Sequence, residues 1–257
     1  MTREILTLKA KWIKRLSAVA VALSLGLVLA SCATKKSNTT SKETSYSYVN
    51  EDGSFTVGKS GAIKTKDISK KATLDVYFDP LCPSCGTFDR ETSEYLTEKV
   101  NSGDLYIHYY PLMFLDQGSS DNYSTRASSY VLAVTEHAPK LAQKFVTAIH
   151  EKSFQPEEGD DYKPVSNAKL DALAKGVGVT KAQLNAVHKD LKAMSNITYK
   201  NTVRVMKDKK LVAKSPTGEL FTPFIIPNKA GSDSGKALSF ESDMLTPTKE
   251  AVENILK

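Results

Sequence analysis

The sequence predicts a mixed α/β domain whose central sheet is interrupted by a long helical insertion. Leu74, Val76 and Phe78 alternate with other residues at the period of a strand that turns one face inward. A Cys-Pro-Ser-Cys motif at 82–85 follows directly and begins a predicted helix. Helical patterns then fill about residues 119–210 before the chain returns to a strand at 224–226. This order predicts a sheet built around the motif.

The remaining elements follow from the same patterns. The helix that contains the motif is expected to end near Gly103, and residues 105–115, rich in Tyr, Ile and Phe, predict the next core strand. Apolar residues at helical spacing predict helices within the insertion around residues 127–134, 141–149, 170–177 and 184–191. Residues 237–240 suggest one more strand, and Thr246-Pro247 is expected to cap a final helix.

The charge of the chain is concentrated at its N-terminus. Residues 1–31 carry five basic side chains against Glu4, a net of +4, which leaves +2 of the total +6 for the rest of the chain. This small remainder is not typical of a nucleic-acid-binding protein. A basic head followed by the uncharged stretch 16–31 is typical of a secretory signal. An uncleaved anchor is the alternative, and both place the domain outside the cytoplasm.

The apolar stretch ends in a possible lipid-attachment site. Leu29-Ala30-Ser31-Cys32 resembles the bacterial lipobox, in which the cysteine receives lipid such as palmitate. We therefore expect a lipoprotein signal peptide at 1–31 and an extracytoplasmic domain held at the membrane by lipid on Cys32. Residues 32–53 are rich in Ser, Thr, Lys and Asn and predict a flexible tether, with the folded domain at 54–257.

The chain has three cysteines, and lipidation of Cys32 leaves the pair Cys82 and Cys85. A disulfide between cysteines so close in sequence constrains the unfolded chain little, so a chemical role is favoured. At the start of a helix, unpaired N–H groups and the helix dipole favour the thiolate of Cys82, which is the attacking species. Cys85 is then the resolving thiol, while Pro83 suits the first helical turn and Ser84 completes the motif.

A metal site and a cofactor are not predicted. Structural zinc sites need a second cysteine pair or nearby histidines. The domain has no further cysteine, and its four histidines are scattered along the chain: His108, His137, His150 and His188. We assign them no chemistry.

Thr222-Pro223 precedes the strand at 224–226. An X-Pro bond adopts the cis form at modest cost, and a trans proline that opens an edge strand is the alternative; given the cysteine motif, we expect the Thr222-Pro223 bond to be cis and to pack against the cysteine pair. Together with the cysteine motif, residues 78–85, the helical insertion and Phe221-Thr222-Pro223-Phe224 resemble the DsbA-like branch of the thioredoxin superfamily.

The resemblance covers about residues 55–257 and implies a thioredoxin fold with its helical insertion between the second core strand, which follows the CxxC helix, and the cis-Pro strand. It also implies a redox-active Cys82–Cys85 pair, contact of a peptide substrate with Thr222 and Pro223, and an unidentified partner that recycles the cysteines.

Three positions depart from the pattern of that branch, and the first is Leu81, where a tryptophan often precedes the first cysteine. The strand position where it commonly has a buried acid is Val76, and Asp75 and Asp79 are expected on the solvated face, so we assign no proton acceptor. Ser84 stands where the oxidases of the branch commonly have histidine.

The predicted function is thiol–disulfide exchange with protein substrates, with the direction left open. The alternatives are a lipid-anchored binding module, in which the CxxC is a static disulfide or a soft-metal (copper) site, and a purely structural envelope lipoprotein.

Overall fold

The computed structural model describes residues 45–64, 71–232, 235–238 and 249–256. The described residues belong to one compact unit within Thr44–Lys257. Cys32, the signal segment and Thr246-Pro247 lie outside the described residues. Within the described ranges, no helix combines the length and the apolarity that a membrane crossing requires.

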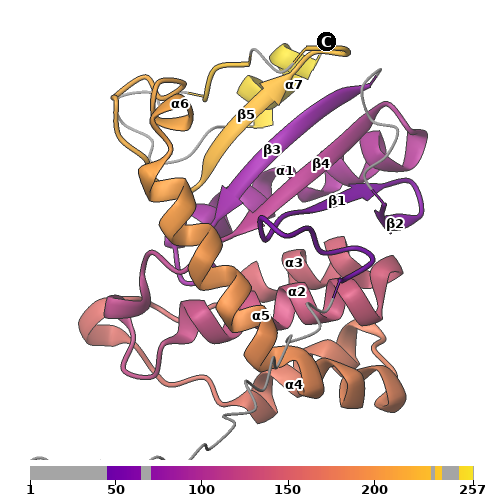
Figure 1. The fold of residues 1–257 in the computed structure, drawn as a ribbon, viewed down its shortest axis with the longest axis vertical. Coiled ribbons are helices and arrows are strands. Elements are labelled where there is room, and N and C mark those ends of the chain that lie inside the picture. The colour runs from indigo at the N-terminus through magenta and orange to yellow at the C-terminus, as the bar shows by residue number, and fades with distance from the viewer. Residues whose placement is uncertain (1–44, 65–70, 233–234, 239–248, 257) are drawn as a thin grey trace, which may run out of the picture. The chain divides into compact units, whose positions relative to one another are not determined.

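Five strands form one sheet in the order β2-β1-β4-β3-β5 (Figure 1). β3 and β4 are parallel, whereas β1 pairs antiparallel with both β2 and β4, and β5 pairs antiparallel with β3. The strand bounds are β1 Phe55–Gly58, β2 Gly61–Ile63, β3 Ala72–Phe78, β4 Leu105–Pro111 and β5 Phe224–Asn228. The predicted alternation in β3 is confirmed, because Leu74, Val76 and Phe78 are all buried in the main core.

The helix α1, Pro83–Ser102, connects β3 to β4 and lies behind the sheet in Figure 1. It ends at Gly103, which adopts a left-handed conformation with φ of 83° and closes the helix through its backbone N–H. The last helix, α7 Lys249–Leu256, lies near β5 on the same side of the sheet. The unit formed by β3, α1 and β4 places the start of α1 directly after the end of β3.

The insertion between β4 and β5 is helical, as predicted. Its elements are η1 Asp116–Gly118, α2 Tyr123–His137, η2 Pro139–Leu141, α3 Ala142–His150, η3 Gly159–Asp161, α4 Asn167–Val177, α5 Lys181–Lys207 and α6 Lys209–Val212. The long helix α5 begins with a capping box of Thr180 and Gln183 and runs along α2 (Figure 1). The fold is therefore a thioredoxin-like α/β sheet with a helical insertion.

The sheet is buried on both faces. Phe78 and Leu74 belong to the main core, which α1, α2 and α3 complete. Tyr77 points the other way and joins a smaller cluster with Val205, Leu211 and Phe224 from α5, α6 and β5. β3, which lies between β4 and β5, is therefore an interior strand of the sheet that is covered on both faces.

Two boundaries differ from the sequence prediction. β4 ends at Pro111 instead of continuing to residue 115, because its partner β3 ends at Phe78, and the bond from Leu112 N–H to the carbonyl of Phe78 at 2.8 Å is the last of their pairing. Ala237 and Leu238 form no strand, although Leu238 N–H donates to the carbonyl of Ile225 at 2.9 Å. Residues 239–240 lie outside the described part.

The described end of the expected tether lies against the domain. The amides of Ser47 and Tyr48 donate to the carboxylate of Glu136 on α2, at 2.8 and 2.9 Å. Val49 is buried in the main core. Contacts of the chain with the domain thus begin ahead of Phe55, and the tether stays a prediction for residues 32–44.

Candidate active site

The turn between β3 and α1 places the two cysteines. Cys82 is the N-cap of α1, with an extended backbone at φ −66° and ψ 118°, and Pro83 occupies the first helical turn. The amide of Cys82 donates to the carbonyl of Asp79 at 3.0 Å, which closes the turn. Pro83 is exposed and Ser84 is half-buried on the first turn of the helix. The attacking position predicted for Cys82 is therefore a helix N-terminus, where a negative charge is stabilised.

The two thiols lie in different environments. Cys82 keeps 6% of its surface exposed, whereas Cys85 keeps 2%. Hydrogen bonds from the Cys85 side chain, then from the Thr222 side chain and the Cys85 backbone, lower the pKa of Cys82 against the opposing effect of burial. Burial, followed by the hydrogen bond and the charge of Cys82, raises the pKa of Cys85 well above that of a free thiol. As the pH rises, the thiolate of the pair therefore forms at Cys82 before it forms at Cys85.

The loop before β5 meets this pair from the far end of the sequence. The Thr222–Pro223 peptide bond is cis, as predicted. The Cys82 thiol donates to the carbonyl of Thr222 at 3.2 Å, and Pro223 lines a small void together with Cys85. Pairing of β5 with β3, in which Phe224 lies opposite Tyr77, brings these residues together. The predicted site residues of the domain therefore meet at one place.

A family model described as thioredoxin matches residues 67–225, which include the cysteine motif and Pro223. The chain belongs to the thioredoxin family. Among solved structures it is similar to the reduced form of the disulfide bond oxidoreductase DsbG from Mycobacterium tuberculosis. The TM-score is 0.58 and the identity 22%, over 81% of this chain and 88% of that one. The oxidised DsbA from Mycobacterium tuberculosis gives a TM-score of 0.55 at 24% identity, over 78% and 91% of the two chains.

A curated relative matches a smaller part of the chain. It is the serine/threonine-protein kinase PknE of Mycobacterium tuberculosis, 36% identical over 118 residues, or 45% of this chain. The match spans only 20% of the length of the kinase.

In this member of the thioredoxin family, the prediction for Asp79 is wrong. The strand alternation assigned Asp79 to the solvated face, but β3 ends at Phe78 and Asp79 turns inward and is fully buried. Its carboxylate accepts hydrogen bonds from the amides of Leu81 and Leu115, at 2.9 and 2.8 Å, and from the Ser124 hydroxyl at 2.6 Å. Burial nevertheless raises its pKa to about 6. Asp79 thus anchors the turn that carries Cys82.

The helical insertion also holds the cysteine turn. The side-chain amide of Gln155 donates to the carbonyls of Pro80 and Cys82, at 3.1 and 2.9 Å. Gly86 permits this approach, because a Cβ atom there would overlap the Gln155 side-chain oxygen. Arg90 of α1 supports the same segment by donating to Gln155 at 3.3 Å. No sequence signal marked Gln155, which lies 73 residues from Cys82.

Two further titratable groups lie behind Cys85. The small void that contains Cys85 and Pro223 is also lined by Asp89 of α1 and by His150 at the end of α3. Both side chains are buried. No chemistry was predicted for His150, because its position beside Cys85 depends on how α3 packs against α1.

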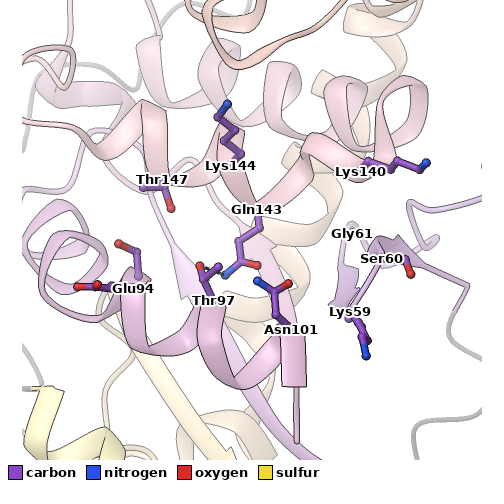
Figure 2. Close-up of a pocket in the computed structure, with 12 residues that line it drawn as sticks. Lys59, Ser60, Gly61, Glu94, Thr97, Asn101, Lys140, Gln143, Lys144 and Thr147 are labelled. Carbon is purple, nitrogen blue, oxygen red and sulfur yellow. Dashed lines mark hydrogen bonds between the residues drawn. The ribbon is translucent and has the colours of Figure 1, made fainter. Parts of the chain in front are cut away.

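A larger hollow lies elsewhere in the described part of the chain. It has a volume of about 730 Å³ and is bordered by the β1–β2 turn, α1 and the segment from η2 to α3. Figure 2 shows Thr97, Asn101 and Gln143 near its centre, while the amino groups of Lys59, Lys140 and Lys144 point away from one another. These lysines do not converge on one anion, and no cysteine lines the hollow.

An apolar groove of about 540 Å³ lies on the side of the loop that leads to Thr222. Its lining includes Met113, Phe114 and Leu220, together with Tyr199 and Met206 of α5. Tyr199 and Met206 are the large apolar side chains with high exposure in the described part of the chain, at 58% and 62%. Leu220 stands two residues ahead of Thr222, whose carbonyl contacts Cys82, so one end of the lining belongs to the loop that reaches the site.

Proposed function

We propose that the protein is an extracytoplasmic thiol–disulfide oxidoreductase that exchanges disulfides with protein substrates through Cys82 and Cys85. The observation that carries the proposal is the asymmetry of the pair: the thiol at the helix N-terminus has a lowered pKa, and its buried neighbour has a raised one. Because the thiolate is the attacking species, Cys82 attacks and Cys85 remains protonated until the second step. The names of the similar structures, a disulfide bond oxidoreductase and a DsbA, support the same function.

The reaction takes two exchanges. The Cys82 thiolate attacks a substrate disulfide, forms a mixed disulfide and releases one substrate thiolate. Cys85 then attacks Cys82, which forms the Cys82–Cys85 disulfide and releases the second substrate thiol. The protein is oxidised by two electrons and the substrate disulfide is reduced. Run in reverse, the same steps oxidise a substrate dithiol, and a separate redox partner returns the pair to its starting state.

A polypeptide substrate suits the surroundings of Cys82. The Thr222 carbonyl stands 3.2 Å from its sulfur, at the edge where a substrate chain would lie. The apolar groove with Tyr199 and Met206 leads away from this loop and offers a surface for apolar side chains of an unfolded segment. Such a surface has no evident use in a static disulfide or a copper site.

The membrane part of the proposal rests on the sequence. Lipid on Cys32 holds the domain outside the cytoplasm, and the signal peptide at 1–31 is removed. A lipoprotein cysteine carries more than one acyl chain, which gives stable anchoring. Mass spectrometry of the membrane-extracted protein should find a lipid-modified N-terminal Cys32. Recovery of an unmodified peptide that retains Met1 would contradict both assignments.

Exchange of single cysteines tests the enzymatic proposal. Cys85→Ser should attack a disulfide-bonded protein substrate and accumulate mixed disulfides, whereas Cys82→Ser should form none. Equal and unreactive behaviour of the two variants would refute the exchange mechanism. Equilibration of the native protein with glutathione then measures the reduction potential, which decides between oxidation and reduction of substrates. A pair that resists reduction throughout would support the static disulfide.

A further inference from the structure

The second exchange step requires a proton acceptor inside the protein. Cys85 is 2% exposed, and burial is the main reason that its pKa is raised. The thiol must nevertheless lose its proton before its sulfur can attack Cys82. The side chain of Val76 lines the void beside Cys85, but it has no group that can accept a proton. Solvent reaches Cys85 poorly, so the acceptor must lie among the buried groups.

The void beside Cys85 contains such a group. Asp89 lies four residues after Cys85 in α1, on the same face of the helix, and both line the void. The Oδ2 atom of Asp89 is buried and makes no hydrogen bond with the described residues, although Thr147 bonds the carboxyl group. An unpaired buried carboxylate oxygen is costly to keep, which indicates a functional reason for it. Asp89 therefore has a free acceptor atom in the same interior space as the thiol.

His150 also lines the void that contains Cys85 and Asp89. Its ring packs edge-on against Phe78 with the ring centres 5.3 Å apart, and neither ring nitrogen has a hydrogen-bonding partner of good geometry in the described structure. Burial and the charge of Arg90 lower its pKa to about 3, against weak opposing effects of the backbone at Val146 and Asp79. The imidazole is consequently neutral at physiological pH, able to accept one hydrogen bond and donate another.

The size of the void fits one water molecule. Its volume of about 10 Å³ is close to the space that a single water occupies. A water there has several polar partners, which a buried water normally needs: the Cys85 thiol, the free oxygen of Asp89 and the ring of His150.

We propose that Asp89 accepts the proton of the Cys85 thiol through one water in this void, which the neutral imidazole of His150 orients. The proposal rests on the exchange function proposed above. In the step, the S–H bond of Cys85 breaks and its proton passes to the water, which gives a proton to Oδ2 of Asp89. The Cys85 thiolate attacks Cys82 in the mixed disulfide, the new disulfide forms, and the substrate leaves as a thiolate that solvent protonates. The pair loses two electrons and the substrate gains them.

The surroundings of Asp89 adjust it to this task. Burial, and next the charge of Glu151, raises its pKa to about 7, while Thr147 and Arg90 act in the opposite direction. Tyr109 of β4 faces Asp89 and stays protonated, because burial and then the Asp89 charge raise its own pKa. At neutral pH a large share of Asp89 is thus ionised and ready to take a proton, as efficient general bases require.

Asp79 is the competing buried carboxyl group and does not have this geometry. The charge of Asp79 acts on both thiols, but both of its oxygens accept hydrogen bonds, from two amides and the Ser124 hydroxyl, and its side chain does not line the void. Accepting a proton there would disturb the turn that holds Cys82. Asp89, in contrast, has a free oxygen and structural support that protonation leaves in place.

A rapid-mixing experiment with the reduced protein and dithiobis(nitrobenzoate) separates the two steps. Attack by Cys82 releases the first thionitrobenzoate, and attack by Cys85 releases the second. The rate of the second release in the native protein should rise through a pH near 7, where Asp89 ionises. In Asp89→Asn this inflection should disappear and the second release should slow about a hundredfold at neutral pH. The first release should be unchanged.

Glu91→Gln is the matched control, since it removes one carboxylate from the exposed side of the same helix. It should leave both releases and the pH profile as in the native protein. A normal first release with an unaltered second release and pH profile in Asp89→Asn would overturn the assignment of Asp89 alone. Loss of the first release in the native protein would overturn the exchange function, and this inference with it.

A measurement on the native protein covers the case in which Asp89→Asn does not fold. Carbon NMR of the aspartate carboxyl groups should show Asp89 titrating near pH 7 in the reduced protein. Its midpoint should shift when the Cys82–Cys85 disulfide forms, because the thiol and its hydrogen bonds are then lost. An Asp89 that titrates in the ordinary range of aspartate, or is insensitive to the redox state, would refute the proposal.

Discussion

Replacement of Asp89 by Asn should stabilise the protein at alkaline pH and have a smaller effect in acid. The pKa of Asp89 is about 7 in the folded protein against an ordinary value of 3.8, a difference of about 3. Between these two values the folded state holds one proton more than the unfolded state, so the free energy of unfolding falls as the pH rises. One pH unit corresponds to about 1.4 kcal/mol, and the total loss is therefore roughly 4 kcal/mol above pH 7.

Asparagine carries no titrating proton and removes this loss. The variant forfeits part of the hydrogen bonding to Thr147, but this contribution does not change with pH. His150 acts in the opposite sense, because its folded pKa of about 3 lies below the ordinary 6.5 and stability is lost as the pH falls through this range. That effect is common to both proteins and cancels in their difference. The difference in unfolding free energy should thus grow by roughly 4 kcal/mol from acid to alkaline pH.

Urea denaturation of the reduced proteins, from about pH 4 to about pH 8, measures this difference directly. Glu91→Gln is again the control, and its difference from the native protein should stay nearly constant because Glu91 is exposed. A difference between Asp89→Asn and the native protein that does not depend on pH would show that Asp89 is ionised normally. Asp89 would then not exchange a proton near neutral pH, and it could not be the acceptor for Cys85.

Other changes test other parts of the site. Ser84→His should lower the pKa of Cys82 further and make the disulfide more oxidising, by about 30 mV for each 1.4 kcal/mol of thiolate stabilisation; an unchanged potential against glutathione would mean that residue 84 does not control it. Gly86→Ala should displace Gln155 and slow alkylation of Cys82, although alanine has the better helix propensity, and Gln155→Ala should have the same effect. Alkylation at the native rate in both variants would show that the hydrogen bonds of Gln155 do not position Cys82. Met206→Lys should slow exchange with an unfolded protein substrate but not with a small disulfide, and equal slowing of both would exclude the groove as a substrate surface.

The motif and the strand before it were predictable because their signals are local. Alternation in β3 identified Leu74, Val76 and Phe78 as buried, and the motif at 82–85 marked the helix start. The same alternation failed one residue later at Asp79, since the rule holds only while the backbone stays extended. The point at which β3 turns is set by tertiary bonds, including those that Asp79 itself accepts from Leu115 and Ser124.

The residues behind Cys85 had no local signal. Asp89 reads as one of several acidic residues on a helix, and only the packing of α3 against α1 makes its face an interior one. His150 and Gln155 lie more than sixty residues beyond the motif, in an insertion whose sequence predicts helices but not their packing. Thr222-Pro223 was found because its position before a strand, combined with the motif, matched a known pattern. Asp89 matched none.

The helical insertion is therefore part of the redox site. The turn before α1 receives hydrogen bonds from Ser124 and Gln155 of the insertion, and the void behind Cys85 is closed by His150. Along α1 itself, the environment changes within one turn, from a helix N-terminus at Cys82 to a buried interior at Cys85. The first favours a thiolate and the second a thiol, so the direction of attack follows from where the helix begins. Because α3 supplies one wall of that interior, a mutation in the insertion that loosens α3 should change the resolving step before it changes the attack by Cys82.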